Sequence, residues 1–372
     1  MSAAGDIVGV SPIEEIIEDA RQGMPFILVD ANDRENEGDL IMPAQFATPR
    51  VVNFMAKHAR GLICLALTAD RAAELRLSPM TANNRSGHGT AFTVSIEARE
   101  GVSTGISAHD RALTIAVATD PGRTADDLVS PGHVFPLVAR DGGVLVRAGH
   151  TEAAVDIARL AGLHPAGVIC EIMSDDGTMA RMPELLTFAR EHQLKVGTIA
   201  DLIALRRKTE KLIEHVVEAP FETHFNADFQ IHVFRNRIDL GEHVALVRGK
   251  IDPEAETLVR VHQVDLTADL LGWTAARKNY VNQALMSLAE YPGAAVGVFV
   301  RDPNPSSISD RVSGGRRDYH LQHGLRDYGV GAQILKHLGV RRMRLMTSSD
   351  AKLFALEGFG LEITSRVAIP LD

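Results

Sequence analysis

With 372 residues, 45% hydrophobic and 23% charged, the chain is too long for one average domain and too apolar to be disordered, so two folded domains are expected. No run approaches the roughly 18 apolar residues of a membrane span, and residues 1–9 lack a basic segment followed by an apolar core, which favours a cytoplasmic protein without a membrane partner. The net charge of −9 lies mainly in residues 1–207, which hold 27 acidic and 19 basic residues; this argues against nucleic-acid binding and favours a cation-requiring site.

An acidic loop between two apolar strands is the first candidate site. Residues 12–23 have a helical apolar period and lead into a buried strand at 26–29. The loop that follows reads Asp33-Arg34-Glu35-Asn36-Glu37-Gly38-Asp39, and Leu40-Ile41-Met42 begins the next strand. Four carboxylates within seven residues repel one another unless a hard divalent cation, together with Arg34, neutralises them. The alternative interpretation is a solvated acidic turn.

The next segments alternate between helix and strand. We expect a helix at 49–60, a strand at 62–68, a short helix at 70–77 and a strand at 91–97. Residues 80–90 are rich in Asn, Ser and Gly, which is typical of a mobile loop or lid. Residues 101–111 form a glycine- and hydroxyl-rich loop that opens a helix; it suits a phosphate or a sugar, and a plain helix cap at Ser107 fits equally well.

A second candidate site follows Pro131-Gly132-His133. We expect a strand at 144–147 and a helix at 153–161, with Arg147, His150 and the N-cap candidate Thr151 in the turn between them. An arginine, a capping hydroxyl and free amides at a helix N-terminus make a phosphate cradle, although a capped helix with a nearby histidine is the simpler interpretation. The imidazole of His150 could ligate the same divalent ion as the acidic loop.

Residues 166–173 place one carboxylate, Glu171, in an otherwise apolar strand. Such a carboxylate is costly unless it is paired or its pKa is raised, which is the condition expected of a proton shuttle. The only cysteines, Cys64 and Cys170, both lie in apolar strand-like runs, so buried thiols are expected rather than a disulfide.

Over roughly residues 10–205 these blocks resemble, in order, the 3,4-dihydroxy-2-butanone 4-phosphate synthase family. The resemblance implies an α+β domain that converts D-ribulose 5-phosphate to 3,4-dihydroxy-2-butanone 4-phosphate and formate, as a homodimer with Mg²⁺ or Mn²⁺ and no organic cofactor. Asn32 stands where an acidic residue is more common. The implied metal ligands are Glu35 and His150, the implied catalytic residues are Glu171, His133 and Glu37, and the implied substrate contacts are Arg34, Asp39, Arg147, Thr151 and Thr104.

The second half has its own alternation of elements. A helical apolar period over 200–217 crosses a charge-rich segment, and we place the domain boundary there, giving domains 1–207 and 208–372. Strands are expected at 229–235, 242–247, 259–262, 296–300 and 343–346, and helices at 280–289, 326–335 and 353–357. This pattern predicts an α/β domain, so the chain as a whole is of the α/β class.

Residues 220–372 resemble GTP cyclohydrolase II through four stretches, residues 243–249, 259–262, 325–335 and 338–341. That family holds zinc with three cysteines, and the matching positions here are Asp265, Ala276 and Lys278. Because residues 208–372 contain no cysteine, thiolate zinc is excluded and no zinc is expected. Gly324 also replaces the expected catalytic Asp, although Arg326 is retained.

Three interpretations of the whole chain follow. The first is a synthase with an inactive second domain kept for structure or regulation, in which Arg326, Thr347 and Lys352 are candidate phosphate contacts. The second is a bifunctional enzyme whose second domain also acts on GTP or a related purine. The third is a protein that only binds a nucleotide or a partner. His320 and His323 could in principle recruit another metal, but a surface role is the simpler interpretation.

Overall fold

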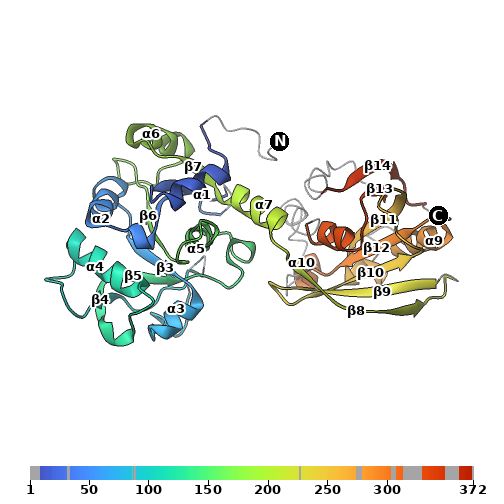
Figure 1. Cartoon of the computed structure of the whole chain (residues 1–372), viewed down its shortest axis with the longest axis horizontal. Coiled ribbons are helices and arrows are strands. Elements are labelled where there is room, and N and C mark those ends of the chain that lie inside the picture. The colour runs from blue at the N-terminus through green and yellow to red at the C-terminus, as the bar shows by residue number, and fades with distance from the viewer. Residues whose placement is uncertain are drawn as a thin grey trace. The chain divides into compact units, whose positions relative to one another are not determined.

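The computed structural model describes residues 9–31, 34–85, 87, 89–225, 228–273, 279–302, 307–312, 329–347 and 360–370. The chain divides into two compact units, Met1–Arg206 and Arg207–Asp372 (Figure 1). Each unit contains a seven-stranded mixed sheet with helices, so the expected α/β class is confirmed. Within the described ranges, no helix is long and apolar enough to cross a membrane.

The first unit is built around a sheet of order β4-β5-β3-β6-β2-β1-β7. Its strands are β1 (Phe26–Val29), β2 (Gly38–Pro43), β3 (Cys64–Leu67), β4 (Ile96–Ala98), β5 (Leu128–Val138), β6 (Gly167–Glu171) and β7 (Val196–Thr198). Its helices are α1 (Ile13–Arg21), α2 (Pro49–Phe54), α3 (Ala69–Glu74), α4 (Ala108–Thr119), α5 (His150–Leu160), α6 (Met182–His192) and α7 (Ile199–Thr209), with a π-helical turn at Met55–Ala59 continuing α2.

Alternate strand residues fill two separate apolar cores. Ile27 and Val29 point into one core, which also contains buried residues of α2, α4 and α6. Phe26 and Leu28 point into the other, which contains buried residues of α1, α5 and α7. The period-two alternation of β1 therefore serves both faces, and the unit has three layers with the sheet in the middle.

The sheet register brings distant parts of the sequence into one row. In the antiparallel pair of β1 and β2, Leu28 lies opposite Asp39, and in the pair of β2 and β6, Asp39 lies opposite Glu171. Side chains directly opposite in such a pair have Cβ atoms about 5 Å apart. The acidic loop and Glu171 therefore lie at the same end of the neighbouring strands β2 and β6.

Several expected elements differ in the structure. Residues 143–145 form a 3₁₀ turn instead of the strand expected at 144–147, because Gly142 and Gly143 have positive φ and the Val144 N–H donates to the Asp156 carboxylate. The strand expected at 91–97 is confined to β4, and α6 was not predicted although Pro183 at its start and the spacing of Leu185 and Ala189 are helix signals. The cap at Ser107 is confirmed, because its hydroxyl accepts the Asp110 N–H at 3.0 Å.

The helix expected over 200–217 is also wrong beyond Thr209. From Ile213 to Glu222 the chain forms a strand, β8, that pairs antiparallel with β9 (Asp228–Asn236). The segment contains Ile213, Val216 and Val217, and β-branched residues favour a strand once a partner strand is present. Pairing with a strand further along the chain therefore decided this segment, which periodicity alone could not reveal.

The second unit has the sheet order β14-β13-β11-β12-β10-β9-β8. One face packs on α9 through Leu288, and the other packs on a helix at residues 329–337 through Ile334. The helix expected at 353–357 lies outside the described residues, as do Ala276, Lys278, Gly324, Arg326 and Lys352. The remaining elements are β10 (Glu242–Arg248), β11 (Glu256–Gln263), β12 (Ala295–Val300), β13 (Arg342–Met346), β14 (Glu362–Val367), α8 (Leu266–Asp269), α9 (Tyr280–Glu290) and α10 (Ser307–Val312).

Candidate active site

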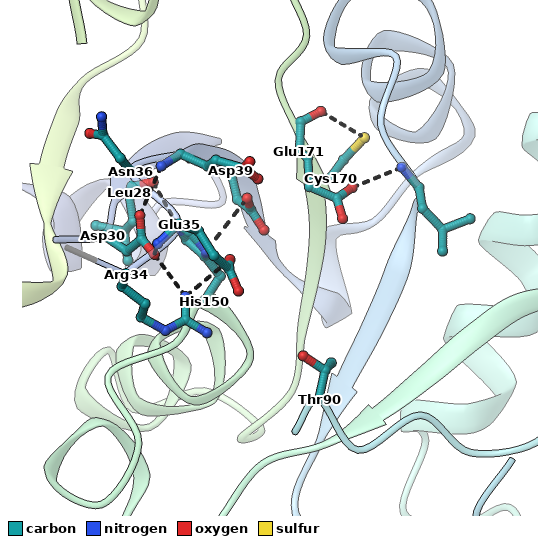
Figure 2. Close-up of polar contacts among 12 residues, drawn as sticks. Leu28, Asp30, Arg34, Glu35, Asn36, Asp39, Thr90, His150, Cys170 and Glu171 are labelled. Atoms are coloured by element: carbon teal, nitrogen blue, oxygen red, sulfur yellow. Dashed lines mark hydrogen bonds and ion pairs between the residues drawn. The ribbon is translucent and has the colours of Figure 1, made fainter. Parts of the chain in front are cut away.

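The acidic loop is folded around a buried carboxylate, Asp30, directly after β1 (Figure 2). Its Oδ1 accepts the Glu37 N–H at 2.8 Å, its Oδ2 accepts the Glu35 N–H at 3.1 Å, and the Arg34 guanidinium donates to Oδ2 at 2.8 Å. Charge-assisted hydrogen bonds of this kind are stronger than neutral ones, so Asp30 fixes the loop's path. Sequence analysis gave Asp30 no role, although a carboxylate at the end of a buried strand was the available signal.

Sequence analysis also gave no role to Arg181, which contacts the backbone of the acidic loop. Its guanidinium donates to the backbone oxygens of Glu35, at 2.7 Å, and of Asn36. It also lies 3.9 Å from the Glu37 carboxylate. Asn36 has a positive φ of 55°, a conformation that Asn tolerates better than most residues. Together these contacts hold the backbone of the acidic loop at Glu35 and Asn36.

Asp30, Glu35 and His150 form a cluster that could hold a metal ion, with one ligand atom from each within 4.8 Å of the others. The His150 Nε2 lies 3.2 Å from the Leu28 carbonyl oxygen, which can only accept, so Nε2 carries the proton and Nδ1 keeps its lone pair. Burial lowers the pKa of His150 and keeps the imidazole neutral. A neutral imidazole is the form that binds a metal.

Asp39 adds a carboxylate to this cluster. It is 3% exposed, its Oδ1 lies 3.6 Å from the His150 Nδ1, and within the described residues this oxygen has no hydrogen-bond partner. Burial, followed by the charges of Glu171 and Glu35, raises the pKa of Asp39 well above its ordinary value. A buried oxygen without a donor is costly, and a cation would satisfy it. Carboxylate oxygens with one imidazole suit Mg²⁺ or Mn²⁺.

Glu171 is the last residue of β6, so it lies at the carboxyl end of the central strand rather than in the strand interior. Its Oε2 accepts the Leu62 N–H at 2.8 Å, which orients the carboxylate. Glu37 lies nearby in the acidic loop, and burial, together with the charge of Glu35, raises the pKa of its carboxyl. Cys64 and Cys170 are buried free thiols as expected, and burial raises the pKa of both.

Arg147 lies just before α5, where the sequence predicts a phosphate cradle. Its guanidinium contacts the Glu152 carboxylate at 2.7 Å and the Thr90 hydroxyl at 3.0 Å. A side chain at Gly149 would collide with it, because a Cβ there would lie 2.4 Å from the Arg147 Nη1. The N-cap of α5 is Gly149, so the expectation of a cap at Thr151 is wrong; Thr151 is the second residue of the helix and is buried.

His133 and Thr104 form a neighbouring group on the other side of the sheet's centre. His133, on β5, contacts Glu97 of β4 at 3.0 Å rather than the acidic loop. The turn containing the exposed Thr104 continues to Gly105, where a Cβ would overlap the Glu97 carboxylate. Because β3 and β6 separate β5 from β2, three strand spacings, or about 14 Å, lie between the two groups.

Family comparisons cover both halves of the chain. Residues 14–205 match the family model of 3,4-dihydroxy-2-butanone 4-phosphate synthase. The chain belongs to this family. Residues 214–368 match GTP cyclohydrolase II, so both resemblances are confirmed. The chain therefore is an enzyme that carries a 3,4-dihydroxy-2-butanone 4-phosphate synthase domain of riboflavin biosynthesis.

Full-length relatives carry two kinds of name. The riboflavin biosynthesis protein RibBA of Aquifex aeolicus is 49% identical and covers 97% of this chain and 92% of its own length. The 3,4-dihydroxy-2-butanone 4-phosphate synthase of Neisseria meningitidis serogroup B is 48% identical, covering 95% of this chain and 97% of its own length.

Solved structures resemble both the whole chain and its first unit. RibBX of A. baumannii, a two-domain 3,4-dihydroxy-2-butanone 4-phosphate synthase, is 40% identical with a TM-score of 0.80, over 97% of this chain and 100% of that one. A 3,4-dihydroxy-2-butanone 4-phosphate synthase in complex with two magnesium ions is 42% identical with a TM-score of 0.52, over 54% of this chain and 98% of that one.

Proposed function

We propose that the first unit converts D-ribulose 5-phosphate to 3,4-dihydroxy-2-butanone 4-phosphate and formate, with Mg²⁺ or Mn²⁺ held by Glu35 and His150. The observation that carries this proposal is the cluster that the partly exposed Glu35 forms with the buried His150 and Asp30. The synthase structure with two magnesium ions supports the same cation class. When bound, the cation polarises the ketose carbonyl and acidifies the adjacent C–H.

The side chains around the cluster have separate tasks in this proposal. Glu171 and Glu37 exchange protons with the substrate, and the Leu62 N–H holds Glu171 in one orientation. Arg34 and Asp39 contact the substrate's hydroxyl groups. Asp30 also positions the loop, because its carboxylate accepts hydrogen bonds from two backbone N–H groups and from Arg34.

Phosphate binding is assigned to the start of α5. Thr151 lies in its first turn, where backbone N–H groups have no partner within the helix and favour an anion. Arg147 supplies a charge beside this turn and is held in place by Glu152 and Thr90. A residue held in this way loses little conformational freedom when the phosphate arrives.

A homodimer is part of the proposal. His133 and Thr104 are assigned to acid–base chemistry and substrate contact, yet they lie about three strand spacings from the acidic loop within one chain. Active sites near a dimer interface would let such groups from two chains serve one substrate. Sedimentation of the purified protein should therefore give twice the chain mass, and a monomer with full activity would contradict the arrangement.

For the second unit we propose a structural or regulatory role without GTP cyclohydrolase II activity. Asp265, at one of the positions where that family has a zinc-binding cysteine, caps α8 through its Oδ1, which accepts the N–H groups of Thr267 and Ala268 at 3.0 and 3.2 Å. Residues 208–372 contain no cysteine to replace it. The second candidate function, a bifunctional enzyme, is favoured by the match of residues 214–368 to the GTP cyclohydrolase II family model.

The test of the first activity is formate release from D-ribulose 5-phosphate. Chelation should abolish turnover, and Glu35→Ala or His150→Ala should lower it by at least about 100-fold, because the cation would be poorly held. His164→Ala, at an exposed histidine outside the site, is the matched control. Near-wild-type turnover in either site variant would contradict the metal assignment.

The test of the second unit has two parts. GTP turnover by the full chain should be undetectable, and measurable turnover would establish the bifunctional alternative. A chain of residues 1–207 retains Arg206, the last residue of the first unit, whose guanidinium contacts the buried Asp156 at 2.6 Å. If the second unit has a structural role, this truncated chain should melt at a lower temperature or turn over more slowly than the full chain.

A further inference from the structure

A cluster of imidazoles lies in the second unit, far along the chain from the acidic loop. The Nδ1 of His232 lies 3.2 Å from the Nε2 of His215 and 3.3 Å from the Oε2 of Glu218. The His215 Nε2 lies 4.0 Å from the same carboxylate oxygen. Three potential ligand atoms therefore surround one point.

A β-bulge makes this meeting possible. His215 and Glu218 are three residues apart on β8, so in a regular strand their side chains would point to opposite faces. In the pairing with β9, however, His215 lies opposite Phe234 and Glu218 lies opposite His232, with the register shifting between His215 and Val217. The extra residue reverses the alternation and places both side chains on the face that carries His232 and Phe234.

A third imidazole approaches from the helix at residues 329–337. The ring of His337, the last residue of this helix, lies 5.2 Å from the ring of His215 and 5.3 Å from that of Phe234. The helix is fixed on this face by Ile334, which shares an apolar core with Phe234. His337 is exposed, and rotation of its side chain would bring the imidazole to the cluster.

The distances between these atoms suit a bound metal ion. With metal–nitrogen distances of about 2.0–2.1 Å, a tetrahedral zinc ion separates neighbouring ligand atoms by roughly 3.3–3.4 Å. The shorter two separations here, 3.2 and 3.3 Å, are close to that value.

We propose that His215, His232 and Glu218, joined by His337, bind one divalent transition-metal ion, with Zn²⁺ the best match. Imidazole nitrogen favours zinc and its neighbours in the first transition row, whereas Mg²⁺ prefers oxygen ligands. The sequence predicts no zinc in the second unit because that unit has no cysteine thiolates. This prediction does not apply to a site whose ligands are imidazoles and a carboxylate. Because β8 is an edge strand, the ion would fasten that edge to the helix at residues 329–337.

The primary experiment measures zinc bound to the full chain by equilibrium dialysis, with excess Mg²⁺ present to compete at oxygen-rich sites. One equivalent of zinc should remain in a His150→Ala background, which separates this site from the acidic loop. His232→Ala should weaken zinc binding at least about tenfold, and His224→Ala, an exposed histidine in the same unit, should not. Equal zinc affinity in the His232→Ala and His224→Ala proteins would overturn the proposal.

Melting temperatures with and without zinc distinguish a loss of zinc binding from misfolding of a variant. Each protein is compared with its own metal-free form, so a lower starting stability does not affect the result. Zinc should raise the melting temperature of the His150→Ala protein and of its His224→Ala derivative, because a ligand that binds only the folded state stabilises it. Glu218→Gln at a mostly exposed position should remove most of that rise. A full zinc-dependent rise in the Glu218→Gln protein would contradict the role of the carboxylate and overturn the site as assigned.

Discussion

Gly61 lies against the strand end that carries Glu171, and Gly61→Ala is a test of how closely that carboxylate must be positioned. A Cβ at Gly61 would lie 2.3 Å from the Glu171 carbonyl oxygen and 2.6 Å from both its backbone nitrogen and its Oε2. Gly61 has no positive φ, so backbone strain at this position does not contribute. The added methyl group acts only by displacing its neighbours.

The displacement can be estimated from the contacts. Ordinary contact distances are about 3.5 Å, so Glu171 and Gly61 must separate by roughly 1 Å. Glu171 cannot yield freely, because β6 is paired with β2 and Asp39 lies directly opposite it. We expect a loss of about 1–3 kcal/mol in the free energy of unfolding, as for other overpacked sites. Misplacing a reacting group by about 1 Å can cost about 100-fold in kcat.

The assay is formate release at saturating D-ribulose 5-phosphate and Mg²⁺, with urea unfolding measured on the same samples. Gly122→Ala is the control, since its Cβ would meet only one flexible side-chain oxygen, at 3.3 Å. Gly61→Ala should lower kcat far more than it raises KM. A folded Gly61→Ala protein with wild-type kcat would refute the reasoning that the position of Glu171 limits turnover.

Three further predictions concern single side chains. Glu171→Gln should abolish turnover while substrate still binds, whereas Thr151→Ala should raise KM first; equal effects on kcat and KM in both variants would mean that these roles are misassigned. Arg206→Met should cost about 3 kcal/mol in urea unfolding, near the lower end for a broken buried pair because a second arginine still contacts Asp156. Adding Asp156→Leu should recover only part of the loss, because the buried Val144 N–H then loses its acceptor. Burial holds the pKa of His243 in the folded protein below its ordinary value of 6.5. The neutral imidazole therefore contributes its full stability above pH 6.5, and that contribution is lost as the pH falls through the lowered pKa. His243→Gln should make the free energy of unfolding less dependent on pH below 6.5, and an unchanged dependence would contradict the prediction.

Local sequence patterns predicted much of the central sheet. The apolar runs at 26–29 and 40–42 became β1 and part of β2, and the loop between them carries the expected carboxylates. These elements could be predicted because burial of a whole strand leaves a continuous apolar run. Residues 144–147 and 213–217 were misjudged, since apolar β-branched residues also occur in turns and helices, and in each case a partner outside the segment itself decided the outcome.

The sequence by itself determined the chain's family through motifs in a fixed order, and its composition excluded thiolate zinc from residues 208–372. Only the tertiary structure decided which carboxylates meet. Asp39 faces Glu171 because of the register between β2 and β6, and His150 reaches Asp30 and Glu35 because α5 packs against the same sheet. Strand register and helix docking are set by contacts between residues more than 100 positions apart, and a shift of one residue would turn each side chain to the other face. A local pattern records which side chains are available, and long-range packing fixes where they point.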